Sequence, residues 1–346
     1  MSKKKIGLIV NPTAGTKKKA RDSEEVILKL GEKAPEYKIV HLSDDTYELA
    51  SQNAKNAVES GELAALIVVG GDGLVHLGFN AVVNTDVPLG IVPSGSGNDF
   101  VRSLHIPTND IAKVVNGIIA GLREQAVLRV DAGHLQSIDD KQQPTGAVDK
   151  YFASILATGL DADIAIATNE SAVKGNFFAY RYHTFSHIAR MYTYDMRVSF
   201  KGVPVHEPLN KIWNAETDET AGKELDYVIE GDTTFVCVAN SQYYGGGVKI
   251  APDADITDGY FRVVYADKLS APSAVVAFMK ARSGNHLPHA HIGEYKTNRV
   301  ILESRSGNVP TSISDGETAG QLPLLVTMAS RAVPVLLHPK AFQQFG

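Results

Sequence analysis

Residues 63–73 read Leu-Ala-Ala-Leu-Ile-Val-Val-Gly-Gly-Asp-Gly, an apolar and partly β-branched run that ends in a glycine-rich turn. A run of this length bounded by turn residues predicts a buried strand over residues 63–69. The residues that follow the turn, 75–83, have the apolar periodicity of a helix. A strand that passes through a tight turn into a helix is the repeating unit of a parallel α/β sheet.

The same alternation extends to both sides of this stretch. Strands are predicted at residues 5–10, 37–42, 63–69 and 88–92, with helices at 17–30, 44–60 and 75–83. Strands that alternate with helices favour a parallel sheet with right-handed crossovers and helices on both faces. We therefore predict a doubly wound parallel α/β domain over residues 1–125.

The sequence pattern changes after about residue 126. Short segments rich in β-branched and aromatic residues are then separated by Gly, Asp, Asn and Pro, which is typical of antiparallel strands. Only residues 178–194 and 272–282 have a helical pattern here. We predict a β-rich second domain over residues 126–330 and a return of residues 331–346 to the first domain, because 332–337 are apolar enough for a buried strand.

Composition excludes several classes of protein. Hydrophobic residues make up 44% and charged residues 21% of the 346-residue chain, as in soluble globular proteins. The net charge of −5 argues against a protein devoted to nucleic acid, which would have a basic surface. The single cysteine, Cys237, excludes an internal disulfide. Without a transmembrane run or a signal peptide in the sequence, we expect a cytoplasmic protein.

Three glycine-rich turns follow three of the predicted strands. They are NPTAG at residues 11–15, GGDG at 70–73 and PSGSGND at 93–99. Glycines let backbone N–H groups approach an anion, and the N-terminus of the following helix adds partial positive charge. Each turn alone is as often structural as functional. Three at the carboxyl ends of parallel strands predict a phosphate site, although neither a Walker motif nor a complete GxGxxG fingerprint is present.

In order and spacing these motifs resemble those of the soluble diacylglycerol kinase family, which includes sphingosine and ceramide kinases and bacterial lipid kinases. The resemblance continues with GLDAD at 159–163, Asn240, YGGG at 244–247, DG at 258–259 and DGE at 315–317, and so covers nearly the whole chain. It implies an NAD kinase-like α/β domain followed by a β-sandwich domain that carries the acceptor side.

The resemblance also implies a reaction: ATP- and Mg²⁺-dependent transfer of the γ-phosphate to a lipid hydroxyl, with diacylglycerol or a relative as the acceptor. Asp315 matches the family's proposed general base, and Asp72, Asp99, Asp131 and Asp315 match its carboxylate and magnesium network. The nucleotide contacts map onto Asn11, Pro12, Thr13, Ala14, Gly15, Ser43, Gly71, Asp72, Gly73, Ser96, Asn98, Asp99 and Glu317. A structural metal site maps onto Asp258, with backbone oxygens near Asp255 and Tyr260.

The partners implied are a lipid substrate and the inner membrane surface, which the protein would contact transiently and without a transmembrane segment. No nucleic acid is expected, and the sequence leaves a homo-oligomer open. Near the first phosphate turn, Lys17, Lys18, Lys19 and Arg21 are either a solvated helix face or a contact to ATP or an anionic bilayer. His286, His289 and His291 are predicted to be surface residues.

Two departures from the family pattern keep other functions open. The GGDGTxNE or GGDGTxHE motif of the family becomes GGDGLVHL, so that Leu74 and Leu77 replace a threonine and a glutamate. A catalytically weakened or non-catalytic nucleotide- or lipid-binding protein is therefore one alternative. An NAD kinase, which shares GGDG, is another. Without the resemblance, Asp315-Gly316 would be read as a surface hairpin turn.

Overall fold

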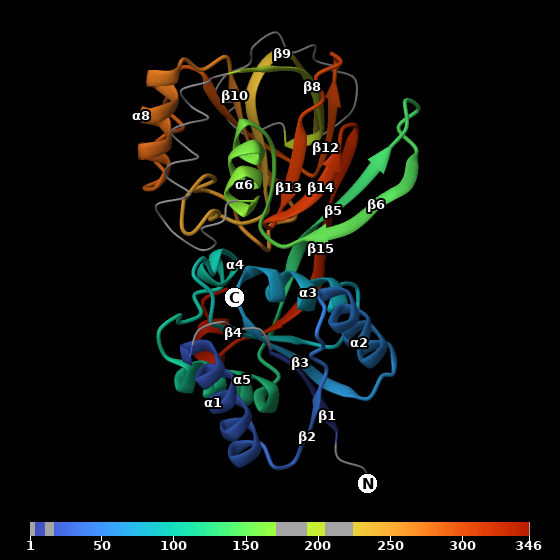
Figure 1. Cartoon of the computed structure of the whole chain (residues 1–346), viewed down its shortest axis with the longest axis vertical. Helices are drawn as coiled ribbons and strands as arrows, with labels where there is room; N and C mark the ends of the chain where they lie inside the picture. The colour runs from blue at the N-terminus through green and yellow to red at the C-terminus, as the bar shows by residue number, and fades with distance from the viewer. Residues whose placement is uncertain (1–3, 11–16, 171–191, 205–223, 346) are drawn as a thin grey trace. The chain divides into compact units, whose positions relative to one another are not determined.

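The computed structural model describes residues 4–10, 17–170, 192–204 and 224–345. The chain forms two compact units (Figure 1). The first comprises residues 1–132 and 330–346, and the second comprises residues 133–329. The chain passes from one unit to the other in strands β5 (Val127–Ile138) and β15 (Leu324–Leu336).

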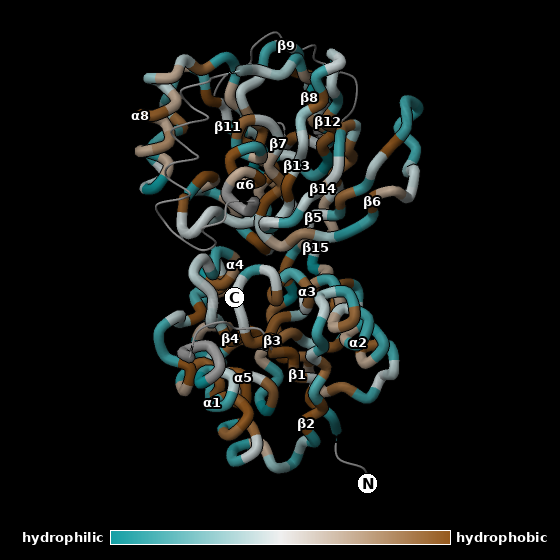
Figure 2. The backbone as a smooth tube through the Cα atoms, in the orientation of Figure 1, coloured by the Kyte–Doolittle hydropathy of each residue, from teal (hydrophilic) through white to brown (hydrophobic). Residues whose placement is uncertain are grey.

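The first unit is built on a parallel sheet, which confirms the predicted α/β class. Its strands are β1 (Lys5–Val10), β2 (Lys38–His41), β3 (Leu63–Gly70), β4 (Leu89–Pro93) and the end of β15. They lie in the order β15-β4-β3-β1-β2, and each neighbouring pair is parallel. The central strands are the apolar ones (Figure 2). Because β3 and β4 are parallel neighbours, their carboxyl ends bring the second and third glycine-rich turns to the same edge of the sheet.

Helices cover both faces of this sheet (Figure 1). They are α1 (Lys17–Lys33), α2 (Tyr47–Glu59), α3 (Asp72–Val82), α4 (Asp99–Ser103), α5 (Ile111–Glu124) and the short α9 (Pro339–Phe342). On one face Val26 and Leu30 of α1 and Ile118 of α5 pack against buried residues of β1 and β3. Side-chain caps begin two helices: Thr46 accepts from the Leu49 N–H, and Asp110 accepts from the Lys113 N–H.

The second unit is antiparallel, which confirms a β-rich second domain. Its further strands are β6 (Pro144–Phe152), β7 (Ile155–Gly159), β8 (Tyr194–Pro204), β9 (Glu224–Ala239), β10 (Phe261–Asp267), β11 (Ile292–Thr297), β12 (Arg299–Ser304), β13 (Thr311–Ser314) and β14 (Glu317–Gln321). Strand β9 pairs with β7, β8 and β10. Aromatic side chains fill the core between these strands; the rings of Phe152 and Phe261 stack at 6.0 Å.

Two helices of the second unit lie in the described part of the chain: α6 (Leu160–Glu170) and α8 (Ala271–Ala281). The pattern at residues 272–282 predicted α8. The sequence pattern did not predict α6. The helix predicted over 178–194 falls almost wholly outside the described residues, and Tyr194 begins β8. Among the described residues, no helix has both the length and the apolarity that crossing a membrane requires.

Candidate functional site

Two glycine-rich turns of the first unit touch backbone to backbone. A Cβ added to Gly95 would lie 2.4 Å from the Cα of Gly71, and one added to Gly71 would lie 3.1 Å from the Cα of Gly95. Real Cβ atoms essentially never come as close as 2.4 Å, so Gly95 requires glycine, and a side chain at Gly71 would need the Gly95 backbone to shift. A Cβ on Gly73, by contrast, would meet nothing within 4 Å. The turns are thus closed toward each other and open at Gly73, beside the N-terminus of α3.

Asp72 ties the two turns together. Its carboxylate accepts from the backbone N–H groups of Asn98 and Asp99, each at 2.9 Å. Asn98 has a left-handed backbone with φ of 54°, and its side chain bonds both the N–H and the carbonyl of Gly95. Asp72 and Asn98 therefore fix the shape of the third turn, and Asn98, itself buried, is a structural member of the site.

Two hydroxyls fasten the edges of this region. The Ser94 hydroxyl donates to the buried carboxylate of Asp22 at 2.8 Å, a partner that the sequence analysis missed. The Ser43 hydroxyl accepts from the Val10 N–H at 2.8 Å and so holds the end of β1 just before the first glycine-rich turn. The predicted contacts Asn11, Pro12, Thr13, Ala14 and Gly15 lie outside the described residues. Ser96 is exposed on the third turn.

Two carboxylates and one guanidinium surround Gly97 in the third turn. A Cβ added there would lie 2.5 Å from Oδ2 of Asp72 and 3.6 Å from Oδ2 of Asp99. The Arg102 guanidinium donates to the Gly97 carbonyl and lies 4.0 Å from Asp99. Magnesium usually takes one or two carboxylates together with waters and substrate phosphates. Asp72 and Asp99 fit that donor set, whereas the fully buried Asp131 accepts from the Arg331 N–H.

In the second unit, Asp315 and Gly316 form the two-residue turn between β13 and β14. Both have left-handed backbones, with φ of 48° and 88°, as in the type I′ turns of hairpins. The Asp315 carboxylate is held by three backbone N–H groups: Ala153 donates to Oδ2 at 2.6 Å, and Ser154 and Ile155 donate to Oδ1 at 2.9 and 3.1 Å. The segment is therefore a hairpin turn whose carboxylate is fixed in place.

Asn240 and Lys150 support this turn, and pattern analysis had not identified Lys150. The amide of the buried Asn240 donates to the Ala153 carbonyl at 2.8 Å, which steadies the segment that holds Asp315. The Lys150 ammonium donates to the Thr318 carbonyl at 2.7 Å. Burial lowers the pKa of Lys150, and the nearby carboxylates of Glu317 and Asp315 oppose that shift. Glu317 itself is exposed at the start of β14.

At the predicted structural metal site, the two carboxylates are engaged by groups of the protein. Asp258 accepts from the Tyr260 N–H and pairs with the Lys296 ammonium at 3.1 Å, while Asp255 accepts from the backbone and hydroxyl of Thr257. Lys296, which also lies over the Tyr260 ring, already supplies the positive charge beside Asp258. Within the described residues no group of three or more His, Cys, Asp or Glu side chains could hold a metal ion.

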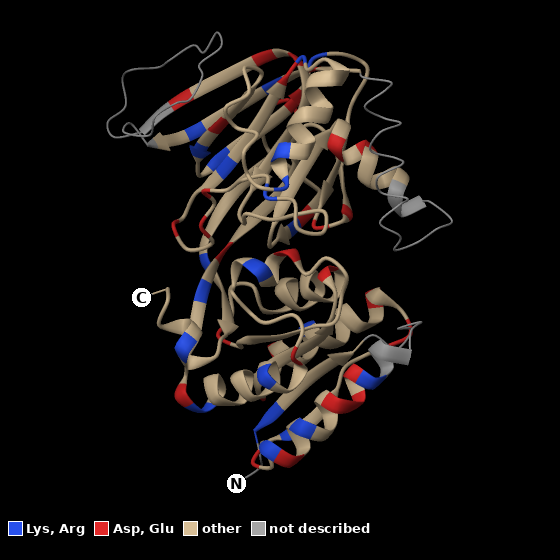
Figure 3. Cartoon of the chain, turned by 90° about the vertical axis from the view of Figure 1, so that its left-hand side faces the viewer, with Lys and Arg blue, Asp and Glu red and all other residues tan. Residues whose placement is uncertain are grey.

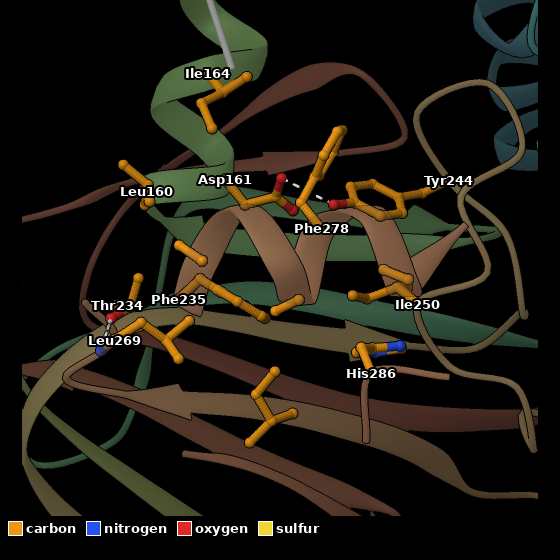
Figure 4. Close-up of a pocket in the computed structure, with 14 residues that line it drawn as sticks. Leu160, Asp161, Ile164, Thr234, Phe235, Tyr244, Ile250, Leu269, Phe278 and His286 are labelled. Atoms are coloured by element: carbon orange, nitrogen blue, oxygen red, sulfur yellow. Dashed lines mark hydrogen bonds between the residues drawn. The ribbon is translucent and has the colours of Figure 1, made fainter. Parts of the chain in front are cut away.

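An apolar cavity of about 560 Å³, which includes space at its mouth, lies in the second unit between α6, α8 and the sheet (Figure 4). Its lining is mostly aliphatic and aromatic, with Leu160, Ile164, Phe235, Ile250, Leu269 and Phe278 among the members. A chain of methylene groups would be a chemically suitable occupant.

Among the described residues, this lining includes the ionisable side chains of Asp161, Tyr244 and His286. Burial raises the pKa of Asp161 to about 6, against the effect of the Tyr244 hydroxyl, which donates to its carboxylate at 2.9 Å. Burial lowers the pKa of His286 to about 4, against the effect of a backbone hydrogen bond with Ile250. The prediction of a surface position was wrong for His286, which is 1% exposed.

Comparison with known proteins matches both units. Residues 5–132 match the diacylglycerol kinase catalytic domain, and residues 154–337 match the YegS C-terminal NAD kinase beta sandwich-like domain. A diacylglycerol kinase of Staphylococcus carnosus (strain TM300) is 27% identical over 328 residues, which cover 93% of this chain and 91% of the relative. A diacylglycerol kinase of Mycobacterium tuberculosis (strain ATCC 25618 / H37Rv) is 26% identical over 272 residues, 79% of this chain and 76% of the relative.

Solved structures share the fold. A crystal structure from Bacillus anthracis str. Sterne has a TM-score of 0.70 at 19% identity and covers 99% of this chain and 98% of that chain. A second, titled as a diacylglycerol kinase from the same organism, has a TM-score of 0.65 at 17% identity and covers 98% of both chains. The second domain match spans more than half of the chain, and the two matches together span both units. This chain therefore belongs to the soluble diacylglycerol kinase family, a family of lipid kinases.

Proposed function

We propose that this protein transfers the γ-phosphate of ATP, with magnesium, to the hydroxyl of a lipid, diacylglycerol or a relative. The observation that carries the proposal is the Asp315 carboxylate, fixed by three backbone N–H groups on a tight turn. Phosphoryl transfer requires little covalent help from a protein, but it requires positioned phosphates and a carboxylate near the attacking hydroxyl. The two units supply these two requirements separately.

The glycine-rich turns of the first unit are the proposed phosphate site. Gly73 leaves open space at the N-terminus of α3, where backbone N–H groups have no partner within the helix. Asp72 and Asp99 would hold magnesium, which neutralises charge on the phosphates when it is bound. The close contact between Gly71 and Gly95 keeps side chains away from this edge. Ser43, Ser96 and Asn11 to Gly15 remain proposed nucleotide contacts.

Asp315 is the proposed general base. One of its oxygens, Oδ1, accepts two backbone N–H groups, whereas Oδ2 accepts one from Ala153. These three donors fix the direction in which the carboxylate would meet a substrate hydroxyl. Lys150 and Glu317 place a positive and a negative group beside this turn, and Glu317 remains a proposed nucleotide contact.

The apolar cavity is the proposed site for the lipid chain. Strand β7 leads from the N–H groups that hold Asp315 to Leu160 and Asp161, which line the cavity. Its five residues span about 16 Å at the usual rise of a strand. A lipid could therefore present its hydroxyl at Asp315 and extend a chain toward α6 and α8. We propose that it does so from the cytoplasmic face of the inner membrane.

Leu74 and Leu77 are the two departures from the family pattern on which the non-catalytic alternative depends. Leu77 is 1% exposed and belongs to the core of the first unit, so it contributes to packing. Leu74 is half-buried and lies against Gly70, at 2.7 Å from a Cβ added there. Neither position disrupts the Gly71 and Gly95 contact or the hydrogen bonds of Asp72. The glycine-rich turns therefore keep their backbone contacts with both leucines in place.

A transfer assay tests this proposal. Purified protein is incubated with labelled ATP and magnesium against a short-chain diacylglycerol, a sphingoid base, a ceramide and NAD, with omission of magnesium as the control. We expect label in a lipid, dependent on magnesium. Label in NAD alone would establish the NAD kinase alternative. Nucleotide binding without transfer to any acceptor would establish the non-catalytic one.

A further inference from the structure

Helix α8 has two apolar faces. Its inward face packs Ala274, Ala277 and Ala281 against the sheet and brings Phe278 to the cavity. On its outward face the side chains of Val276 and Met279 are 46% and 66% exposed. A helix on the surface of a globular protein ordinarily has one apolar stripe toward the core and a polar face toward water. The outward face of α8 departs from that pattern.

The exposed apolar residues of α8 form a stripe, unlike the other exposed ones. Pro272, Val276 and Met279 are all exposed and follow the i, i+4, i+7 spacing of one helix face. Leu28 on α1 is exposed singly, and Tyr47 and Leu49 on α2 are two positions apart and do not share a face. Single exposed apolar residues need no explanation, whereas a contiguous stripe indicates an interaction surface.

Positive charge gathers at the C-terminal end of this stripe. Lys280 and Arg282 are exposed there, and Lys249 is tied to the same end by the bond from its N–H to the Ala281 carbonyl at 3.0 Å. Residues 268–293 contain no aspartate or glutamate, on the side of the molecule that faces the viewer in Figure 3. Around the segment, Asp267 pairs with His291 and Asp232 with Lys268, and Asp253 lies in the loop after Lys249.

We propose that the outward face of α8 binds an anionic lipid bilayer. Val276 and Met279 enter the boundary between head groups and acyl chains, and Lys280, Arg282 and Lys249 lie against the head groups, as in interfacial helices. The stripe is too small for a stable protein partner, which needs about 800 Å² from each side. This proposal rests on the proposed function for its purpose: α8 then separates the bilayer from the cavity that receives the lipid chain.

Vesicle binding without nucleotide tests the apolar part. The protein is sedimented with vesicles of phosphatidylcholine alone or mixed with phosphatidylglycerol, and we expect binding to the mixture that weakens with salt. The double variant Val276→Ser/Met279→Ser should bind about tenfold or more weakly, because two exposed apolar side chains are lost from the contact. The matched control Leu28→Ser/Leu49→Ser removes two exposed apolar side chains from the first unit and should bind as the wild type does.

Charge reversal tests the electrostatic part. Lys280→Glu/Arg282→Glu should weaken binding at least about twentyfold, since each cation at an anionic surface contributes about fivefold. The control Lys55→Glu/Lys113→Glu makes the same change in net charge at two exposed lysines of the first unit. Equal losses in both charge variants, unchanged binding in the α8 variants, or no vesicle binding by the wild type would overturn the proposal. So would a dimer that only the Val276→Ser/Met279→Ser variant dissociates.

A kinetic comparison separates this proposal from the proposed function. The α8 variants leave the residues that line the cavity unchanged, so we expect them to phosphorylate a water-soluble short-chain lipid at the wild-type rate and to lose activity on lipid in vesicles. Vesicle binding through α8 in a protein that phosphorylates no lipid would overturn the proposed function and support the surface. Equal transfer to vesicle lipid by wild type and variants would support the proposed function and overturn the α8 surface.

Discussion

The two candidate sites use the backbone in opposite ways. In the first unit Gly71 and Gly95 have no side chains, so their two turns can touch. The space around Gly73, at the start of α3, stays open. In the second unit three N–H groups, from Ala153 to Ile155, are already engaged by the Asp315 carboxylate. In the proposed function, the first site offers backbone N–H donors to a phosphate, whereas the second uses its backbone donors to hold a carboxylate.

This difference predicts different kinds of sensitivity. The glycine site should respond to added volume and tolerate charge changes outside it, because its contacts are steric. The Asp315 site should respond to a change of hydrogen-bonding character with no change in volume, because an unmatched donor near a buried group is costly. Each variant below tests one side of that contrast.

Asp315→Asn should have the largest effect. The amide cannot accept a proton, and general-base catalysis contributes about 10²–10⁴-fold in rate. Its NH₂ group would also face a backbone N–H of the Ala153–Ile155 segment, so we expect the free energy of unfolding to fall by about 1–3 kcal/mol. Turnover and thermal melting measure the two effects. Asp139→Asn is the matched control, because Asp139 also accepts two backbone N–H groups in a hairpin turn; turnover in Asp315→Asn equal to that control would remove Asp315 as the base.

Gly95→Ala and Gly73→Val should separate packing from ligand approach. The new Cβ at Gly95 would clash with the Gly71 backbone, and such overpacking costs about 1–3 kcal/mol. Gly73 has open space around it, so Gly73→Val should melt near the wild-type temperature yet lose the thermal protection that ATP with magnesium gives. Protection retained in a folded Gly73→Val variant would place the phosphate site elsewhere.

The sequence predicted the elements and the turns better than the contacts between them. Apolar runs and glycines located β1 to β4 and the turns after β3 and β4, because these signals are local. Helix α6 was missed because Leu160-Asp161-Ala162-Asp163 alternates like a strand, and its helical form depends on packing over the sheet. The predicted elements also do not include α5.

Long-range partners had no local signal. Gly71 and Gly95 touch although they are far apart in the chain, and so do Asp315 and its three backbone donors. The burial of His286 likewise depends on distant segments that pack around it. The motif resemblance singled out Asp315. It could not indicate that Asp315 is both a residue of a hairpin turn and a carboxylate held by three backbone N–H groups. Lys150 belongs to no glycine-rich or acidic motif, so only its contact with Thr318 reveals it.

In the cavity of the second unit, the free energy of unfolding should depend on pH. Burial disfavours the charged form of both Asp161 and His286, and these two forms appear at opposite ends of the pH range. The pKa of Asp161 is raised to about 6, so its contribution to stability is present below about pH 4 and is lost as pH rises through 6. The pKa of His286 is lowered to about 4, so its contribution is present above about pH 6.5 and is lost as pH falls through 4. Each is worth about 3 kcal/mol, and between pH 4 and 6 they oppose each other.

Single variants should therefore tilt the stability profile in opposite directions. Relative to wild type, Asp161→Asn should gain stability as pH rises from 4 to 6, because the charged carboxylate is gone. His286→Leu should gain stability as pH falls over the same range, because no imidazole has to stay neutral. Denaturant unfolding at a series of pH values measures both. Parallel profiles for the two variants would contradict the assigned burial effects.

The smallest expected effect concerns Lys150. Lys150→Met removes the ammonium beside the Asp315 turn and its bond to the Thr318 carbonyl, and we expect turnover to fall about tenfold, as for loss of a charged hydrogen bond. Lys150→Arg keeps a charge and should retain most activity, and Lys141→Met, at the exposed tip of the same hairpin, should retain all of it. Burial lowers the pKa of Lys150, so wild-type turnover should decline at a lower alkaline pH than that of Lys150→Arg, whose guanidinium stays charged. Coincident alkaline limbs for wild type and Lys150→Arg would mean that the charge of Lys150 does not act on the site, and its bond to Thr318 would then only shape the turn.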